Sequence, residues 1–230
     1  LCPGISPRRP AVSMAPRVDE ASRPKPVVPV QFEDLTEIIP QRLYWSSNGS
    51  VPQDTYHSHF FSTDTTLVYE PFSQDFGPLS LSMTYRYCKI VEAKLNSPAL
   101  AGKRIVHICG TNQDQRANSA LLTCLFQVII LRKSPKEAYQ PFVGIRPPFR
   151  PFRDAITGPC TFNLTIMDCL EGMYRALDLG WFDMETFDVG LYDALANPYR
   201  CDATWIVPNK FLAFAGPSGT PVDAQGYPAF

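Results

Sequence analysis

Residues 103–119 read KRIVHICGTNQDQRANS, and this stretch decides the fold class. The pattern predicts a short apolar strand, a polar loop and then a helix. His107 and Cys109 stand at the end of the predicted strand, and Arg116 stands where the helix begins. A loop of this layout can hold an oxyanion with its backbone N–H groups and the N-terminus of the following helix. The first hypothesis is therefore an anion-binding loop on an α/β sheet.

The same residue types serve cysteine-dependent phosphate hydrolysis, in which a thiolate attacks phosphorus and an arginine binds two phosphate oxygens. An active loop of that kind has Cys directly after His and five residues between Cys and Arg. Here one residue separates His107 from Cys109, and six separate Cys109 from Arg116. Gly110 is the only glycine of the loop, and Asp114 adds negative charge where a phosphate dianion would lie. We therefore predict a degenerate, non-catalytic loop, with Arg116 bound to a nearby carboxylate or a helix end.

Composition limits the other functions. The 230 residues suffice for one domain, or for one domain with part of a second. With 21 basic and 22 acidic side chains no basic field is expected, so no nucleic-acid partner is predicted. The seven cysteines and three histidines lack metal-ligand spacing, and we predict neither a metal nor another cofactor. The longest apolar run, residues 120–131, is too short to cross a bilayer, so no membrane partner is predicted.

The beginning of the chain has a different composition. Residues 1–30 hold seven of the 23 prolines, and we predict that residues 1–32 form a disordered, Pro-rich leader. The chain starts with Leu1, and its first methionine is Met14. We interpret it as a fragment or an imperfect gene model, and leave open whether it is a complete protein.

From about residue 33 strands alternate with helices, which predicts an α/β domain with a mixed sheet flanked by helices. Ser134 and Glu137 form a capping-box pattern, and Asp188 is placed to cap a brief helix. The predicted strands are 42–45, 59–61 with 67–69 nearby, 104–108, 205–207 and 211–214. The predicted helices are 78–95, 117–131, 134–142, 162–179 and 188–197.

Several long strings now occur in order along the chain. They are RLYW at 42–45, FFSTDTTLVYEPFSQDFGPLSL at 60–81, YRYCK at 85–89, KRIVHICGTNQDQRANSA at 103–120, PPFRPFRDAITGPCTFNLTIMDCLEG at 147–172 and WIVPNKFLAFAGP at 205–217. Together they resemble the N-terminal half of the mitotic-exit dual-specificity phosphatases, the cell-division-cycle-fourteen family. The resemblance implies two tandem phosphatase-like domains. The first lacks catalytic residues and helps to recognise substrate, whereas the second carries the Cys-to-Arg loop.

The resemblance gives a domain map. Residues 33–186 would form the non-catalytic phosphatase-like domain, 187–203 the linker, and 204–230 the first part of a truncated catalytic domain. The rest of that catalytic domain would be the main partner. No active loop of the HC, five residues, Arg pattern occurs in this chain. The chain alone is therefore expected to be inactive.

The resemblance also implies an acidic linker groove that receives a basic residue of the substrate. In LYDALANPYRCDATW, residues 191–205, Asp193 and Asp202 fall at acidic positions of the family pattern. Ala196 replaces a usual Glu and Arg200 adds a positive charge, so we expect a groove that is weaker or differently tuned. The substrates would be proteins phosphorylated on Ser-Pro sites by cyclin-dependent kinases. The resemblance alone implies residence in the nucleus, the nucleolus and the cytoplasm, and at the spindle pole.

Two alternative functions stay open. The chain can be read as a complete pseudophosphatase that binds phosphopeptides, or as a weak cysteine phosphatase acting through Cys109. The pair Arg153-Asp154 has the residue types of a general acid and its partner. We favour a salt-bridged turn there, because no nucleophile accompanies the pair.

Overall fold

The structure of this chain is a computed structural model that describes residues 35–198 and 200–216. The predicted leader, residues 1–32, lies outside the described residues, as does the end of the chain after residue 216. The strands are β1 (Thr36–Ile39), β2 (Leu43–Ser46), β3 (Ser58–Phe61), β4 (Arg104–Ile108), β5 (Phe152–Arg153), β6 (Asn163–Leu164), β7 (Ala203–Val207) and β8 (Phe211–Phe214). The helices are α1 (Leu81–Asn96), α2 (Gln113–Ile129), α3 (Pro135–Tyr139), α4 (Ile166–Asp178) and α5 (Val189–Ala196), with short 3-10 turns at Pro98–Leu100 and Gln140–Phe142.

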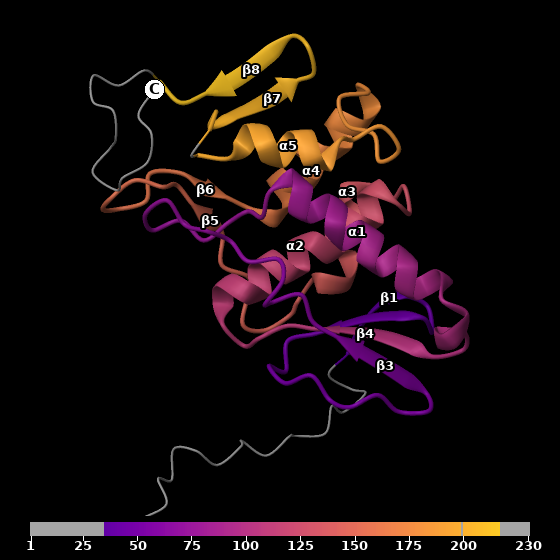
Figure 1. Cartoon of the computed structure of the whole chain (residues 1–230). Helices are drawn as coiled ribbons and strands as arrows, with labels where there is room; N and C mark the ends of the chain where they lie inside the picture. Colours follow the sequence, from indigo (N-terminus) through magenta and orange to yellow (C-terminus); the bar gives the residue numbers. More distant parts are fainter. Residues whose placement is uncertain (1–34, 199, 217–230) are drawn as a thin grey trace, which may run out of the picture.

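The main sheet has the strand order β1-β2-β4-β3. β1 runs antiparallel to β2, whereas β4 runs parallel to both of its neighbours. Figure 1 shows α1 and α2 over one face of this sheet, with α5 and the β7–β8 hairpin at the far end of the molecule. The predicted α/β class with a mixed sheet flanked by helices is confirmed. Because β4 is an inner strand that leads into α2, the loop after it lies at the carboxyl edge of the sheet.

Helix α2 forms the centre of the hydrophobic core. Every residue from Arg116 to Ile129 is buried, and α1, α3 and α4 all pack against this helix. The prediction of a buried helix here is confirmed, but the helix begins at Gln113, four residues before the predicted start. The reason is a local cap: the Asn112 side chain accepts hydrogen bonds from the backbone N–H groups of Asp114 and Gln115. The polar first turn therefore belongs to the helix.

Helix ends follow the capping residues more closely than the apolar pattern. α1 begins at Leu81 rather than at residue 78, because Ser80 caps it by accepting a hydrogen bond from Met83 N. α4 begins at Ile166 rather than at 162, because Thr165 and Asp168 form a capping box. The predicted capping box of Ser134 with Glu137 is confirmed.

At the start of the domain, one predicted strand is absent and one strand that was not predicted is present. No strand forms at 67–69, because the N–H groups of Thr66 and Leu67 both donate to Thr63 O and close a turn there. The strand that was not predicted is β1. Three of its four residues are β-branched, which favours a strand, and the strand pairs with β2 through a tight connection.

The end of the described chain forms α5 and a two-stranded hairpin. Asp188 caps α5, as predicted, by accepting a hydrogen bond from Leu191 N. The two predicted strands become β7 and β8, which among the described strands pair only with each other, and Asn209 takes a positive φ of 59° in the turn between them. All four residues of β8 are exposed. The assignment of this hairpin to a second domain stays a prediction.

Candidate phosphate loop and linker carboxylates

Cys109 lies directly after β4, where a phosphatase nucleophile is expected, but it is buried. Burial raises the pKa of the Cys109 thiol to about 12. A nucleophilic cysteine needs the opposite shift, because the thiolate is the species that attacks. At neutral pH Cys109 therefore carries its proton and packs as a small apolar side chain.

Four backbone N–H groups of the loop and of the first turn of α2 donate to acceptors within the chain. Cys109 N donates to Ser46 O at 2.9 Å, and Gly110 N donates to Asp64 Oδ2 at 2.6 Å. The N–H groups of Asp114 and Gln115 donate to Asn112 Oδ1. A Cβ added at Gly110 would stand only 2.1 Å from Gln115 Oε1. Side chains of this protein thus fill the place where a phosphate would bind.

The Arg116 guanidinium, which a phosphate would need, is also engaged elsewhere. It is buried, with Nε directed to Ser47 Oγ at 3.3 Å, Nη1 to Gln113 Oε1 at 2.8 Å and Nη2 to Pro147 O at 3.0 Å. It also stacks over the Phe149 ring, 5.2 Å from the ring centre. The predicted partner was a nearby carboxylate or a helix end, and the acceptors are instead two neutral side-chain oxygens and the Pro147 carbonyl. Neutral oxygens satisfy the guanidinium because the connector at 147–149 packs directly against it.

His107 joins three elements of the core instead of facing the loop. Its Nε2 contacts Thr63 Oγ1 at 3.2 Å, and its Nδ1 contacts the Tyr87 hydroxyl of α1 at 2.9 Å. That hydroxyl also contacts Thr123 Oγ1 of α2 at 2.9 Å. Complete burial lowers the pKa of His107 to about 3, so the imidazole is neutral at physiological pH. The arrangement gives His107 a packing role.

Two further acidic residues near the loop are held in turns or ion pairs. Asp114 lies in the first turn of α2 and pairs with Arg150 at 3.1 Å. Asp154 accepts hydrogen bonds from the Thr161 backbone and hydroxyl, and these bonds lower its pKa. Arg153 Nη2 lies 3.6 Å from Asp154 Oδ1. An ionised, hydrogen-bonded Asp154 fits the favoured salt-bridged turn, since a general acid must hold a proton at working pH.

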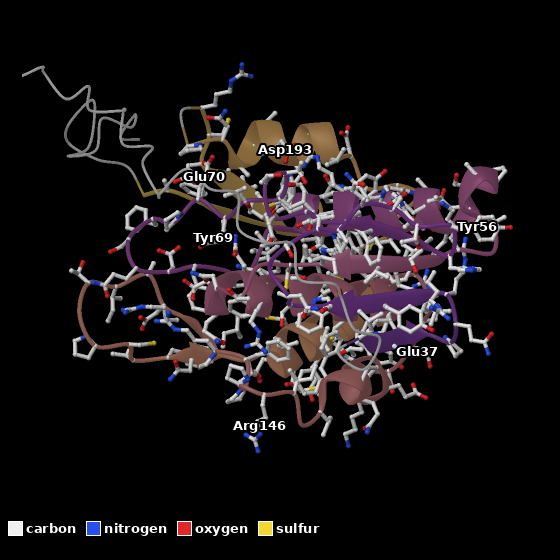
Figure 2. The ribbon with its side chains drawn as sticks, turned by 90° about the horizontal axis from the view of Figure 1, so that it is seen from below. Glu37, Tyr56, Tyr69, Glu70, Arg146 and Asp193 are labelled. Carbon is white, nitrogen blue, oxygen red and sulfur yellow. The ribbon has the colours of Figure 1, made fainter. Side chains whose placement is uncertain are left out.

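The two linker carboxylates occupy different surroundings. Asp193 projects from α5 and forms an ion pair with Arg86 of α1, and this bond lowers the pKa of Asp193. Figure 2 shows Asp193 at the edge formed by α5, away from Glu37 of β1. Asp202 is exposed at the bend before β7, where it has a φ of 41° and its N–H donates to Asn197 O. Within residues 35–198 and 200–216 no hydrogen bond or ion pair joins the two, so their sharing of one groove stays a prediction.

A mostly apolar pocket of about 320 Å³ adjoins the linker, and sequence reasoning did not find it. It lies where α5 and the β7–β8 hairpin meet the segment at 181–188. Three of its aromatic lining residues are Trp181, Phe182 and Phe187. Its other main lining residues are Leu191, Tyr192, Leu195 and Trp205. Neither Asp193 nor Asp202 lines this pocket.

In the part of the chain that the structure describes, no three side chains of His, Cys, Asp or Glu lie close enough together to hold a metal ion. Among the described helices, none has the length and apolar character needed to cross a bilayer.

Comparison with known proteins supplies the family context. Residues 37–176 match the family described as dual specificity protein phosphatase, N-terminal half. The human dual specificity protein phosphatase CDC14A is 48% identical over 193 residues, which cover 84% of this chain and 32% of the relative. Mouse CDC14B is 38% identical over 86% of this chain and 41% of its own length. The tyrosine-protein phosphatase CDC14 of Saccharomyces cerevisiae is 31% identical over 82% of this chain and 34% of its own length.

Proposed function

This chain belongs to the CDC14 family of dual specificity protein phosphatases and corresponds to their N-terminal half, and we propose that it serves there as the substrate-recognition and scaffold domain. The chain spans about a third of the length of the CDC14A relatives that it matches. The phosphatase activity of the whole protein is therefore part of the proposal. In it, a catalytic half with an intact Cys-to-Arg loop performs the hydrolysis.

The observation that carries this proposal is the state of the loop after β4. Asp64 binds Gly110 N, the Cys109 thiol is buried, and the Arg116 guanidinium is directed at neutral oxygens. A phosphate entering this loop would meet the Asp64 carboxylate at the Gly110 N–H. Attack on phosphorus at this site would require exposure of the thiol and removal of its proton. The loop therefore favours a structural role for this domain over an independent phosphatase or a phosphopeptide-binding module.

The end formed by α5 and the hairpin is the proposed contact with the catalytic half. Phe211 and Phe214 of β8 are 68% and 66% exposed, and Trp205 of the same hairpin lines the pocket of about 320 Å³. Exposed aromatic side chains next to a concave surface are typical of interaction sites. Placing the catalytic half here would also bring the linker carboxylates next to its active site.

We propose that the substrates of the whole protein are proteins phosphorylated on Ser-Pro sites by cyclin-dependent kinases, with Asp202 and Asp193 attracting a basic residue after the phosphosite. Asp202 is exposed and makes no ion pair within the described part of the chain, so it is the more available of the two. Asp193 shares its charge with Arg86. An exposed ion pair between a carboxylate and a basic side chain contributes about 1 kcal/mol to binding.

The experiment joins this chain in frame to the remaining two-thirds of human CDC14A. The assay compares kcat/KM on two phosphoserine-proline peptides, one with a downstream Lys and one with Ala in its place. We expect Asp202→Ala to lower kcat/KM about fivefold on the Lys peptide only, which corresponds to about 1 kcal/mol. Asp178→Ala is the matched control, because Asp178 is an exposed carboxylate of α4 paired with Arg175 outside the linker.

If Asp202→Ala lowered kcat/KM equally on both peptides, Asp202 would not recognise the downstream Lys, and the proposed role of the linker would be wrong. The unfused chain gives a second test, in which it should hydrolyse no aryl phosphate and bind no phosphopeptide. Turnover that disappears in Cys109→Ser would instead favour the weak phosphatase.

Residence in the nucleus, nucleolus and cytoplasm and at the spindle pole is proposed from the family alone, and imaging of the tagged fusion protein tests it.

A further inference from the structure

A second cluster of titratable side chains lies on the opposite end of β3 from the phosphate-like loop. Asp54, in the loop before β3, contacts His59 of β3 through Oδ2 and Nδ1 at 2.7 Å. His59 Nε2 in turn contacts Lys94 Nζ of α1 at 2.9 Å. A carboxylate, an imidazole and an amine thus stand in line, each within hydrogen-bond distance of the next. None of the three takes part in the function proposed above.

The hydrogen positions in this line follow from the acceptor at one end. Partial burial works to raise the pKa of Asp54, but hydrogen bonds from His59 and from Phe60 N outweigh it and hold that pKa below its usual value. An ionised carboxylate only accepts, so His59 Nδ1 carries the proton that it donates to Asp54. The Nε2 lone pair then accepts a hydrogen bond from Lys94 Nζ. This is the arrangement in which an imidazole acts as a general base toward an adjacent nucleophile.

The surroundings of Lys94 favour the neutral amine more than those of an ordinary surface lysine. The Lys94 side chain is half-buried between α1 and β3, which opposes the charged form, whereas the Phe61 ring centre, 4.7 Å from Nζ, favours it. Burial lowers the pKa of Lys94, and the charge of Asp54 partly opposes this shift. Lys103 is a further charged group nearby; it donates a hydrogen bond to Thr55 O, and its charge lowers the pKa of Asp54. By contrast, Lys89 of the same helix is exposed and pairs with Glu92 at 3.6 Å.

We propose that Lys94 is a reactive lysine that small acyl thioesters modify, with His59 as the general base and Asp54 as the residue that positions the imidazole. The Lys94 nitrogen attacks the carbonyl carbon of the thioester, and His59 Nε2 takes a proton from that nitrogen. The C–S bond then breaks, and the sulfur leaves as a thiol with the proton from His59. The product is an amide on Lys94, which has lost the positive charge over Phe61 and keeps a single N–H.

A thioester is the donor class that fits this cluster. The leaving thiolate is weakly basic, so the reaction needs an unprotonated amine and a proton acceptor and no further activating group. Both are supplied by the His59–Lys94 contact at 2.9 Å. A small acyl group is required because Lys94 is half-buried, and β3 and the loop around Asp54 border its ammonium group.

The test incubates the wild-type chain with acetyl-coenzyme A over a series of pH values and follows acetylation of each lysine by peptide mass spectrometry. Lys89 is the internal control, because it stands on the same helix. We expect Lys94 to react about tenfold faster than Lys89 at about pH 7.5, and its rate to rise at lower pH than that of Lys89. A Lys94 rate equal to or below the Lys89 rate would overturn the proposal.

Two variants separate general-base assistance from simple exposure. His59→Gln keeps a hydrogen-bonding side chain without a basic nitrogen, and it should bring the Lys94 rate close to the unchanged Lys89 rate. Asp54→Asn should lower the Lys94 rate in the same direction while leaving the thermal melt intact, because Asp54 lies on an exposed loop. An unchanged Lys94 rate in either folded variant would overturn the proposal. If His59→Gln fails to fold, the comparison of the Lys94 and Lys89 rates in the wild-type chain and the Lys94 rate in Asp54→Asn still test the proposal.

Discussion

The Asp64 carboxylate accepts a hydrogen bond from the Gly110 backbone N–H at 2.6 Å, although the two residues are 46 positions apart in the chain. This contact ties the segment after β3 to the loop after β4. Burial raises the pKa of Asp64, while the hydrogen bonds from Gly110 N and Ser62 act in the opposite direction. The loop therefore holds an anion of its own, and the chain needs no phosphate to order it.

Removal of this carboxylate should destabilise the fold without creating an enzyme. In Asp64→Ala the Gly110 N–H loses its acceptor, and we expect a loss of about 1–2 kcal/mol in the free energy of unfolding. Asp64→Asn retains an acceptor oxygen and should lose less. Urea denaturation measures both. Aryl phosphate hydrolysis should stay absent, because Cys109 remains buried. Activity appearing in Asp64→Ala would show that Asp64 alone blocks a competent site.

The fold should weaken on mild acidification because of His107. Its pKa is lowered to about 3 in the folded chain, whereas an unfolded histidine titrates near about 6.5. The unfolded state therefore binds more protons below about pH 6.5, and stability falls as the pH decreases through this window. Between about pH 6 and pH 5 the loss should approach 1.4 kcal/mol per pH unit. In this interval most paired carboxylates are still ionised.

Urea titrations at several pH values measure this slope. His107→Gln is the matched variant, because a glutamine can still hydrogen-bond Tyr87 but does not titrate. Its stability at neutral pH is expected to be lower, and its slope between about pH 6 and pH 5 should be much smaller than that of the wild type. Equal slopes in the two proteins would assign the pH dependence to other groups.

Arg116 should behave as a structural residue. Its guanidinium bonds Ser47, Gln113 and Pro147 and stacks on Phe149, a geometry that a lysine cannot reproduce. Arg116→Lys is expected to lower the free energy of unfolding by about 1–3 kcal/mol, since buried oxygens lose their donors. Arg150→Lys serves as the control, because Arg150 is exposed and makes a single ion pair with Asp114. Similar losses in both variants would contradict the structural role of Arg116.

The sequence predicts those features that depend on neighbouring residues. The capping box of Ser134 and the cap by Asp188 need only three or four consecutive positions, and both form as expected. The contacts that close the loop link residues far apart in the chain. Gly110 with Asp64 and Arg116 with Pro147 are examples, and no local pattern encodes them. The loop could be recognised as degenerate from its spacing, but the carboxylate that fills it could not.

The pairing of Asp193 with Arg86 illustrates the same limit at the linker. The resemblance selected Asp193 for its acidic position, yet its partner lies 107 residues earlier, on α1. Only the packing of α5 on α1 brings the two side chains together. This contact makes the two linker carboxylates unequal, which their sequence positions do not reveal.

The exposed hairpin strand should make the unfused chain associate with itself. β8 has one paired edge and one free edge among the described strands, and Phe211 and Phe214 are 68% and 66% exposed. An open apolar edge is a template for pairing with another chain. The double variant Phe211→Ser, Phe214→Ser is therefore expected to shift sedimentation toward the monomer, with the melting temperature nearly unchanged. Phe162→Ser is the control, because Phe162 is 64% exposed outside the hairpin. If the wild-type chain already sediments as a monomer, or if Phe162→Ser has the same effect as the double variant, the hairpin is not the surface that drives association.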